Sequence, residues 1–449
     1  MKKVALHNLG CKVNSYEIEV MQQRLQEKGY EIVPFAQFAD IYIINTCTVT
    51  NIADRKSRQM LHRAKQLNPE AVVVAVGCYV QTGRDNIEQD DGVDLAIGNN
   101  RKKDIVEILE EYLENKKDKT LGGTTIIDIN HTDEYEEMQL KQTAEHTRAY
   151  IKIQDGCNQF CSYCVIPYAR GRVRSRREED ILSEVRALAK KGYREIVLTG
   201  IHISSYGLEK GTVYSGESKL IDLVERLHEI EGIDRIRLGS LEPRVVTEEA
   251  ARRLAALPKV CPHFHLSLQS GCDETLKRMN RRYTTGEYYS CVEHLRKAFE
   301  NPAITTDVIV GFPGETEEEF AQTKAFLEKV GFYEMHVFKY SKRAGTVAAK
   351  MPNQVPETVK ASRSNELLQL EKEQSRRFRE QYIGREVQIL SEEMKQIAGA
   401  DYLLGHTADY VKVALPAGEQ EKEKGLDAIV RVCITDFLTD EIMLAAPCK

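Results

Sequence analysis

Short apolar runs alternate with amphipathic segments along the first part of the chain. The segments 16–26 and 53–67 place apolar residues three and four positions apart, which predicts helices. The apolar runs predict strands at 4–6, 41–44 and 71–76. Because strands that alternate with helices form parallel sheets, residues 1–115 are expected to fold as an α/β domain.

The alternation stops near residue 116, and residues 116–147 are expected to connect two domains. This stretch holds a Lys-rich run, a Gly-Gly pair and an acidic run, which favour a loop. The strand–helix pattern returns in residues 148–375. Six strands are expected there, at 150–153, 195–199, 235–238, 263–268, 306–310 and 334–338. Six such units predict a partial (β/α)6 barrel, in which ligands bind at the carboxyl ends of the strands.

The last part of the chain has a different pattern. A long charged helix is expected at 359–382, and short apolar runs separated by glycines follow it. These runs predict strands at 387–390, 411–414, 428–434 and 442–444. Residues 383–446 are therefore expected to form a small all-β barrel.

The composition narrows the class of protein. The chain has 449 residues, of which 42% are hydrophobic and 29% charged, as in globular proteins with two or three domains. The formal net charge of -6 excludes a protein that binds polyanions over its whole surface. We find no apolar run long enough to span a membrane and no signal peptide, so we expect a cytoplasmic protein without a membrane partner. In a reducing compartment, the eleven cysteines are more typical of metal ligands than of disulfides.

Three cysteines lie in one short loop after the first expected barrel strand. Cys157, Cys161 and Cys164 have three and then two residues between them, and thiolates clustered in a loop are typical of iron–sulfur sites. A structural zinc site needs four ligands, and the next histidine along the chain is His202. Three ligands leave one iron open for a substrate. Three purely structural thiols are the alternative, which this specific spacing disfavours.

Three further cysteines share a different placement. Cys11, Cys47 and Cys78 each follow an expected strand and precede a helix. In a parallel sheet these three points lie along one edge, so the thiols are expected to meet at a second cluster. Three buried thiols are the alternative. No shared pattern joins the remaining five, which are expected to be packing or surface thiols: Cys261, Cys272, Cys291, Cys433 and Cys448.

Small or polar residues follow several of the expected barrel strands, where a backbone approaches a ligand. We predict that they bind a cofactor, although ordinary turns would have the same composition. The residues are Gly200, Ser240, Glu242, Gln269 and Gly311.

The run C-x3-C-x2-C resembles the signature of the radical S-adenosylmethionine (radical SAM) superfamily. Two three-cysteine sites followed by a terminal β domain, which resembles the TRAM domain, are similar over essentially the whole chain to the radical SAM methylthiotransferases. The resemblance implies S-adenosylmethionine and two [4Fe–4S] clusters. Cys157, Cys161 and Cys164 would hold the cluster that binds S-adenosylmethionine, and the N-terminal trio would hold an auxiliary cluster. It also implies insertion of a methylthio group at a C–H bond, with an electron donor such as flavodoxin or ferredoxin and a sulfur donor as partners.

Three short sequence motifs resemble those of one branch of that family. They are Leu-Gly-Cys-Lys-Val-Asn at 9–14, Asn-Thr-Cys-Thr-Val-Thr at 45–50 and Thr-Gly-Ile-His at 199–202. The branch (MtaB-type) converts N6-threonylcarbamoyladenosine (t6A) at position 37 of tRNA, next to the anticodon, to its 2-methylthio derivative. Alternatives are the same chemistry on isopentenyladenosine in tRNA or on a ribosomal-protein aspartate, a radical enzyme that inserts no sulfur, and a non-enzymatic zinc-containing RNA-binding protein.

Basic residues suggest where tRNA binds. A dense run after the central cysteines is predicted to hold the anticodon arm by its phosphates, and consists of Arg170, Arg172, Arg174, Arg176 and Arg177. The expected helix 53–67 adds cations that fit either RNA contact or an ordinary solvated face, namely Arg55, Lys56, Arg58, His62, Arg63 and Lys65. Residues 384–443 instead carry twelve acidic and six basic side chains, so a broad phosphate-binding surface is not expected there.

Overall fold

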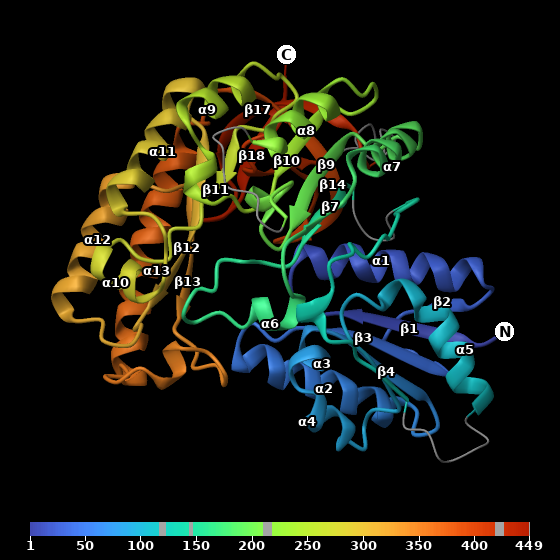
Figure 1. Cartoon of the computed structure of the whole chain (residues 1–449). Helices are drawn as coiled ribbons and strands as arrows, with labels where there is room; N and C mark the ends of the chain where they lie inside the picture. Colours follow the sequence, from blue (N-terminus) through green and yellow to red (C-terminus); the bar gives the residue numbers. More distant parts are fainter. Residues whose placement is uncertain (116–122, 143–146, 210–217, 418–425, 449) are drawn as a thin grey trace.

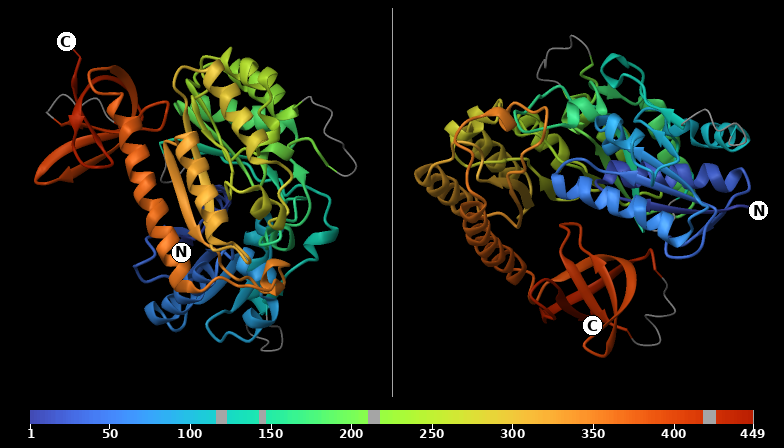
Figure 2. Two further views of the ribbon diagram at one scale, coloured as in Figure 1. Left: turned by 90° about the vertical axis from the view of Figure 1, so that its left-hand side faces the viewer. Right: turned by 90° about the horizontal axis from the view of Figure 1, so that it is seen from below.

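A computed structural model of the chain describes residues 1–115, 123–142, 147–209, 218–417 and 426–448 (Figure 1). The N-terminal α/β domain lies against a partial barrel, and a small β-barrel stands at the side of that barrel, beyond a long helix (Figure 2). Among the described residues, no helix combines the length and apolar character needed to cross a bilayer.

The N-terminal domain is built on a six-stranded parallel sheet with the order β2-β1-β3-β4-β5-β6. Its strands are β1 (Lys3–Asn8), β2 (Glu31–Val33), β3 (Ile41–Thr46), β4 (Val72–Gly77), β5 (Leu95–Ile97) and β6 (Gly123–Thr125). Its helices are α1 (Lys12–Glu27), α2 (Asn51–Leu67), α3 (Cys78–Thr82), α4 (Arg84–Glu88), α5 (Ile105–Asn115) and the 3-10 turn η1 (Lys102–Asp104). The α/β prediction is confirmed. The strands that it missed, β2, β5 and β6, have three residues each, too few to show a period.

The stretch predicted as a plain connection is partly built into this domain. Strand β6 extends the sheet, and Met138 and Leu140 pack in its core with Tyr16. The Tyr16 hydroxyl also donates to the Met138 carbonyl. Along the chain, a 3-10 turn, η2 (Ile129–His131), lies between β6 and Met138. Residues 116–122 and 143–146, which include the Lys-rich run, lie outside the described residues.

The central domain is a partial barrel, as predicted. Six parallel strands line it, and a two-residue strand, β8 (Arg174–Ser175), pairs antiparallel with the first of them. The six are β7 (Ala149–Asp155), β9 (Glu195–Gly200), β10 (Arg235–Leu238), β11 (His263–His265), β12 (Ala303–Val310) and β13 (Glu334–Lys339). Single bridges from Ile236 to Val260 and from Leu241 to Leu266 join the β10-β9-β7-β8 and β11-β12-β13 sheets.

Helices cover the outside of this barrel, apart from α6 (Ile166–Arg170), which packs on α3 of the N-terminal domain. The outer helices are α7 (Glu178–Lys190), α8 (Lys219–His228), α9 (Glu248–Ala255), α10 (Asp273–Arg278), α11 (Thr285–Ala298), α12 (Glu317–Val330) and α13 (Glu357–Glu380). Short 3-10 turns complete the connections, at η3 (Ile203–Ser205), η4 (Pro243–Val245) and η5 (Ala348–Lys350). Capping boxes start two of the helices, α11 through Thr284 and Glu287, and α12 through Thr316 and Glu319. The outer strand face and these helices form one apolar core.

The C-terminal domain is a closed barrel with the strand order β14-β15-β16-β18-β17, which confirms the predicted small β-barrel. Its strands are β14 (Glu386–Ile397), β15 (Ala400–His406), β16 (Lys412–Pro416), β17 (Ile429–Phe437) and β18 (Met443–Pro447). The sequence did not predict β15. Arginines of β10 hold this barrel in place, because Arg235 donates to the Gln388 carbonyl (2.8 Å) and Arg237 to the Ala408 carbonyl (2.8 Å).

The N-terminal domain is fixed to the first strand of the partial barrel by buried charges. Glu17 of α1 is fully buried and pairs with Lys102 of its own domain, with Lys152 of β7 (2.7 Å) and with Arg170 of α6 (3.0 Å). Burial alone would raise the pKa of Glu17, but the three cations hold it well below its usual range. Glu17 is therefore ionised in the docked molecule.

A second contact reaches the N-terminal domain from the other side of the barrel. Arg343, in the loop after β13, donates to the Thr48 hydroxyl (2.7 Å) and to Asn51 (2.6 Å), and pairs with Asp54 (2.7 Å). The N-terminal domain thus bridges the open side of the partial barrel, from β7 to the loop after β13.

Replacement of Glu17 tests this docking contact. Glu17→Gln leaves buried cations without their counter-charge and is expected to lower the free energy of unfolding by about 3–5 kcal/mol. The measurement is urea denaturation of the full chain. The matched control is Glu27→Gln on the same helix, whose ion pair with Lys141 is exposed and should contribute less than about 1 kcal/mol. Equal effects of the two variants would contradict the role of Glu17.

Candidate active site

The N-terminal cysteines follow three neighbouring strands, as predicted. Cys11 comes after β1, Cys47 directly after β3, and Cys78 directly after β4. These strands pair in parallel, β1 with β3 and β3 with β4, so their carboxyl ends share one edge. The thiols are close enough for their charges to interact. Burial, with smaller contributions from negative charges at Cys78 and Cys11, raises the pKa of Cys47 to about 11.

Glycines allow the strand ends to approach one another here. Gly10 has φ +110°, and a Cβ on it would lie 3.1 Å from the Cys47 sulfur. Gly77, before Cys78, has φ +100°, and a Cβ on it would lie 2.6 Å from Asn45 Oδ1. Any other residue at either position would be strained and crowded.

Arg170 joins this edge to the partial barrel. Its Nε donates to Cys78 Sγ (3.1 Å), and its Nη2 donates to Asn14 (2.5 Å) as well as to Glu17. Asn99 Nδ2 lies 3.6 Å from the same sulfur. Burial would lower the pKa of Arg170, but the negative charges of Cys78, Glu17 and Asp155 raise it well above its usual value. A permanent cation therefore lies beside Cys78.

The central cysteines lie in the loop that follows β7. A second loop, 278–283 at the end of α10, clamps it. Ser162 donates from its backbone to the Met279 carbonyl (3.0 Å), and Asn280 donates to the Phe160 carbonyl (2.9 Å). Arg281 Nη1 donates to Cys161 Sγ (3.3 Å), and its guanidinium lies over the Tyr283 ring. Each cysteine trio thus has one arginine that donates to a sulfur.

Burial raises the pKa of two central thiols. The pKa of Cys157 and of Cys164 is about 12, and the negative charge of Cys161 contributes to both shifts. Thiolates are what a metal binds, so a bound cation must offset this burial. Arg281 lowers the pKa of both thiols and is the protein's own contribution to that offset.

Of the predicted cofactor residues, Glu242 is hydrogen-bonded to the cysteine loop. It accepts a hydrogen bond from Gln159 of that loop (3.3 Å), pairs with Arg244 (3.1 Å) and lies 3.5 Å from His202. Burial lowers the pKa of His202, although Glu242 opposes that shift. The imidazole is therefore neutral near pH 7 and can act as a hydrogen-bond partner beside the loop.

The other four predicted cofactor residues lie at strand ends in different environments. Gly200 ends β9 and faces Gln154, while Ser240 is exposed beyond β10. Gln269 follows β11 and is buried with φ +72°. Gly311 faces Lys360 of α13, and its N–H donates to Glu315 (2.8 Å), so packing against α13 accounts for it.

The predicted RNA-binding arginine run needs a correction. Arg170, Arg174 and Arg176 are buried, so they cannot grip phosphates from outside. Arg176 pairs with Glu184 (2.6 Å), and Arg174 donates to the Arg170 carbonyl (3.0 Å). Of the other two, Arg172 is half-buried over the Phe160 ring, and Arg177 is exposed but pairs with Asp180 (2.6 Å). The three buried arginines therefore belong to an internal ion-pair network with Glu17, Asp155 and Glu184.

Of the remaining five cysteines, three are separate and two lie together. Cys261, Cys272 and Cys291 are buried singly, as expected of packing residues. Cys433 and Cys448 meet in the C-terminal barrel, with their sulfurs 2.9 Å apart.

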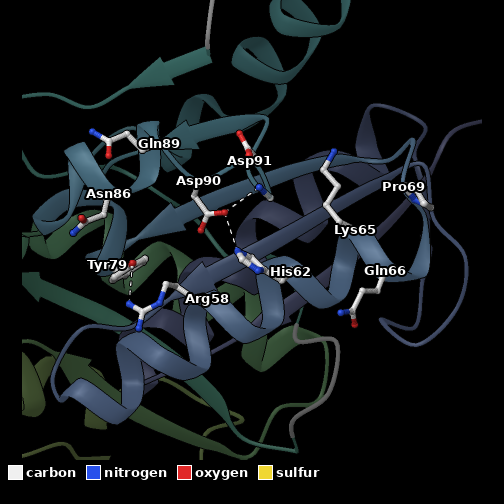
Figure 3. Close-up of a pocket in the computed structure, with 11 residues that line it drawn as sticks. Arg58, His62, Lys65, Gln66, Pro69, Tyr79, Asn86, Gln89, Asp90 and Asp91 are labelled. Atoms are coloured by element: carbon white, nitrogen blue, oxygen red, sulfur yellow. Dashed lines mark hydrogen bonds and ion pairs between the residues drawn. The ribbon is translucent and has the colours of Figure 1, made fainter.

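A large open groove lies outside both cysteine sites. It has a volume of about 950 Å³ and runs beside α2 (Figure 3). His62 contacts Asp90 (2.8 Å) and Arg58 donates to the Tyr79 hydroxyl (3.2 Å), so both basic side chains are already engaged. Neither cysteine trio lines this groove.

The spacing of the sulfurs distinguishes a cluster from a single metal ion. Among the described residues, neither trio brings its three sulfurs within 4.8 Å of one another. Sulfurs on one tetrahedral zinc ion would be about 3.8 Å apart, given Zn–S bonds of about 2.3 Å. In an iron–sulfur cluster each cysteine binds a different iron, so the cysteine sulfurs lie farther apart than ligands of one ion, and the spacing of both trios is compatible with a cluster.

Known proteins match this chain over most of its length. The model described as Radical SAM superfamily matches residues 151–327, and the model described as Uncharacterized protein family UPF0004 matches residues 3–98. The threonylcarbamoyladenosine tRNA methylthiotransferase MtaB of Bacillus subtilis is 42% identical over 93% of this chain and 91% of its own. The chain belongs to the radical SAM methylthiotransferase family.

Two further relatives and one solved structure also match this chain. The MtaB protein of Aquifex aeolicus is 41% identical over 89% of this chain and 95% of its own. A tRNA-2-methylthio-N(6)-dimethylallyladenosine synthase from Methylacidiphilum infernorum is 35% identical over 94% of this chain and 90% of its own. Among solved structures, the radical S-adenosylmethionine methyltransferase TsrM of Kitasatospora setae shares the fold, with a TM-score of 0.56 and 16% identity over 75% of this chain and 73% of its own.

This family uses S-adenosylmethionine and two [4Fe–4S] clusters. The structure offers two donor sets of three thiols to hold them, each with an arginine beside one sulfur. The sequence did not point to Arg281, Tyr283 or Asn280 as parts of the site, because they lie more than 110 residues after the cysteine loop and form no motif.

Removal of the arginine beside Cys161 tests the electrostatics of this site. Hydrogen bonds to cluster sulfurs stabilise the reduced, more negative state. Arg281→Ala is therefore expected to lower the reduction potential of one cluster on the order of 50 mV, which corresponds to about one charge-assisted hydrogen bond. An EPR-monitored redox titration measures this potential. Arg282→Ala removes the exposed neighbouring charge and should leave the potential unchanged. A shift of equal size in both variants would contradict the assigned role.

Proposed function

We propose that this enzyme converts t6A at position 37 of tRNA into 2-methylthio-N6-threonylcarbamoyladenosine. The two cysteine trios support methylthio transfer, because they provide two separate cluster sites. The MtaB relatives support the substrate, because those at 42% and 41% identity are named as threonylcarbamoyladenosine tRNA methylthiotransferases. The dimethylallyladenosine enzymes match less closely, at 35–36% identity.

When bound at the central site, the cluster and S-adenosylmethionine supply a radical that removes a hydrogen atom from the substrate carbon. The side chains of this chain hold the parts in place. Asn280 and Ser162 fix the backbone of the cysteine loop, and Arg281 fixes one thiolate. Glu242 and His202 form a polar wall beside that loop, on which the polar groups of the cofactor can bind.

The two sites are held in one geometry by a short piece of chain. Helix α6 begins two residues after Cys164 and ends at Arg170, whose side chain reaches Cys78. Only five residues, 165–169, therefore separate a predicted central ligand, Cys164, from the arginine of the N-terminal site. A substrate bound between the sites would find both at fixed distances, as transfer of a methylthio group to an activated carbon requires.

Helix α2 offers a surface for the tRNA backbone. Arg55, Lys56 and Arg63 are exposed, and they have no ion pair with other described residues. The helix starts beside the N-terminal site, where Ser57 donates to the Cys47 carbonyl (3.1 Å). Cations near this site can hold the anticodon arm while position 37 enters the site. The C-terminal barrel contributes through shape or a few residues, since its segment is acidic.

The proposed function also implies two partners and a cytoplasmic location. An electron donor such as flavodoxin or ferredoxin must reduce the clusters, and a sulfur donor must supply the inserted atom. Both fit a cytoplasmic enzyme that meets tRNA there.

Cysteine variants test the proposed division of labour. Cys157→Ala is expected to abolish both S-adenosylmethionine cleavage and product, because the radical site loses a ligand. Cys47→Ala is expected to retain cleavage but stop sulfur insertion. Mass spectrometry of tRNA nucleosides from cells that carry each variant measures the product, and 5′-deoxyadenosine measures cleavage.

Three results would contradict the proposal. Full product from Cys47→Ala would remove the second cluster from the mechanism. If cells without the gene lost the methylthiolated isopentenyl nucleoside but kept the methylthiolated t6A derivative, isopentenyladenosine in tRNA would be the substrate. An unchanged nucleoside pool in cells without the gene would favour a protein substrate. Cys261→Ala, a buried thiol outside both sites, is the matched control and should retain full product.

A triple variant tests the tRNA surface. Replacement of Arg55, Lys56 and Arg63 by alanine is expected to raise KM for tRNA without lowering kcat, and to reduce the salt dependence of tRNA binding by about two to three in log–log slope. The control removes three exposed cations of the α7 region that have no ion pair with described residues, namely Arg186, Lys190 and Lys191. Equal loss of binding in both triple variants would argue for non-specific charge and against a surface on α2.

A further inference from the structure

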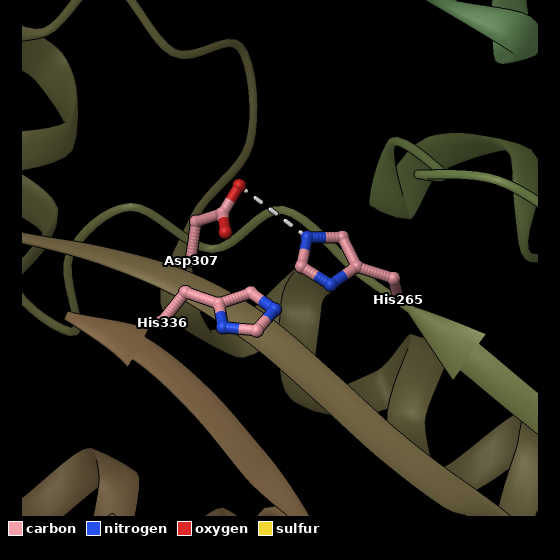
Figure 4. Close-up of side chains that lie close together, drawn as sticks. All are labelled: His265, Asp307 and His336. Atoms are coloured by element: carbon pink, nitrogen blue, oxygen red, sulfur yellow. Dashed lines mark ion pairs between the residues drawn. The ribbon is translucent and has the colours of Figure 1, made fainter. Parts of the chain in front are cut away.

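A group of potential metal ligands lies outside both cysteine sites. His265, Asp307 and His336 come from the neighbouring strands β11, β12 and β13, and their ligand atoms all lie within 4.8 Å of one another. Figure 4 shows the three side chains turned toward a common space. We propose that these residues bind one divalent transition-metal ion.

Strand register brings the three side chains together. Asp307 pairs directly with His336, and His265 pairs with Thr305, two residues before Asp307. Their strand neighbours Phe264, Val308 and Met335 pack in the core beneath the outer helices. Because side chains alternate along a strand, the three ligands project from the opposite, inner face of the partial barrel. A site on packed strands is more rigid than one on loops.

The first two ligands are already at a suitable distance. His265 Nε2 lies 3.3 Å from Asp307 Oδ2. Two ligands on one metal ion with bonds of about 2.0–2.2 Å are about 3.0 Å apart in octahedral geometry and about 3.4 Å apart in tetrahedral geometry. His336 is exposed, so rotation of its side chain can complete the set.

A second-shell hydrogen bond favours this orientation of His265. Its Nδ1 lies 3.0 Å from the Thr305 hydroxyl. When Nδ1–H donates to that oxygen, the lone pair of Nε2 points toward Asp307. In known metal sites, histidines are oriented in the same way, by a hydrogen bond from the ring nitrogen that does not bind the metal. Two acceptors facing each other are stable only when a cation lies between them or one of them is protonated.

An ordinary His–Asp ion pair accounts for two of these residues but not for the third. The His336 ring stacks on His265, with centroids 5.8 Å apart, and its nitrogens have no hydrogen bond to other described residues. Two imidazoles and one carboxylate form a donor set suited to Zn²⁺, Fe²⁺ or Mn²⁺. The side chains of His265 and Asp307 are 13% and 29% exposed, so positions remain open for water or a further oxygen ligand.

Zinc binding to the full-length, cluster-loaded protein tests this site. The protein is dialysed anaerobically to equilibrium against micromolar Zn²⁺, and mass spectrometry counts zinc and iron per chain in the same sample. One zinc per chain is expected with iron unchanged, and X-ray absorption at the zinc edge should show nitrogen and oxygen ligands near 2.0–2.1 Å without sulfur near 2.3 Å, both values being approximate.

Matched variants assign the binding. Asp307→Asn and His336→Gln are each expected to weaken zinc binding at least about tenfold, and the exposed position of His336 makes misfolding of that variant no explanation. The control is His131→Gln, whose Nδ1 lies 2.8 Å from Asp128 but which has no third ligand among the described residues. It should bind zinc like the wild type.

Three outcomes would overturn the proposal. They are no zinc beyond background, equal zinc in the wild type and in both site variants, and a sulfur shell around the zinc. None of these readouts depends on the tRNA substrate, so failure of this site and failure of the proposed function remain distinguishable.

Discussion

The buried carboxylate of Glu17 is the interaction on which the arrangement of the enzyme depends. It lies on a helix of one domain and takes its counter-charges from Lys152 and Arg170 of the other. A buried carboxylate without enough counter-charge costs several kcal/mol, so Lys152 and Arg170 stabilise the docked arrangement of the two domains. The same arginine donates to Cys78. Domain docking and the geometry of the N-terminal cysteine site are therefore one physical event.

Buried charges of both signs gather around this contact. Lys102, Lys152, Arg170 and Arg174 surround Glu17 and Asp155, and buried Glu136 also interacts with both lysines. One of these cations, Arg170, donates to the Cys78 sulfur. The central site follows the same logic on a smaller scale, with Arg281 beside Cys161. In both places the protein supplies part of the charge that its ligands need.

Much of this architecture could be predicted from the sequence. All six barrel strands and the parallel N-terminal sheet were expected, because continuous apolar runs mark buried parallel strands. The convergence of Cys11, Cys47 and Cys78 followed from strand order alone. Their role as cluster ligands stays a prediction, as does that of the central trio, since the structure places the thiols and does not identify what they bind.

Other features depended on contacts that no local pattern shows. The sequence predicted an exposed RNA-binding patch at the arginine run 170–177, because no local pattern identifies its counter-charges. These are Glu17 of the N-terminal domain, Asp155 at the end of β7 and Glu184 of α7. Arg281 belongs to no motif, and β15 follows Gly399 directly and contains Gly405, so its apolar run is short. Burial of charge is a tertiary property, and sequence distance conceals the partners that make it possible.

The order of residues in the Glu17 network also has a consequence for synthesis of the chain. Cys11, Cys47 and Cys78 leave the ribosome before Lys152, Asp155 and Arg170 do, because synthesis proceeds from the N-terminus. Until those residues emerge, Glu17 can pair only with Lys102, and the sheet edge that bears the cysteines has no barrel against it. Iron delivery to this edge therefore has an open period during translation that ends when the barrel docks. The central cysteines have a separate and later open period. It ends when loop 278–283, which is made more than a hundred residues after them, clamps the cysteine loop.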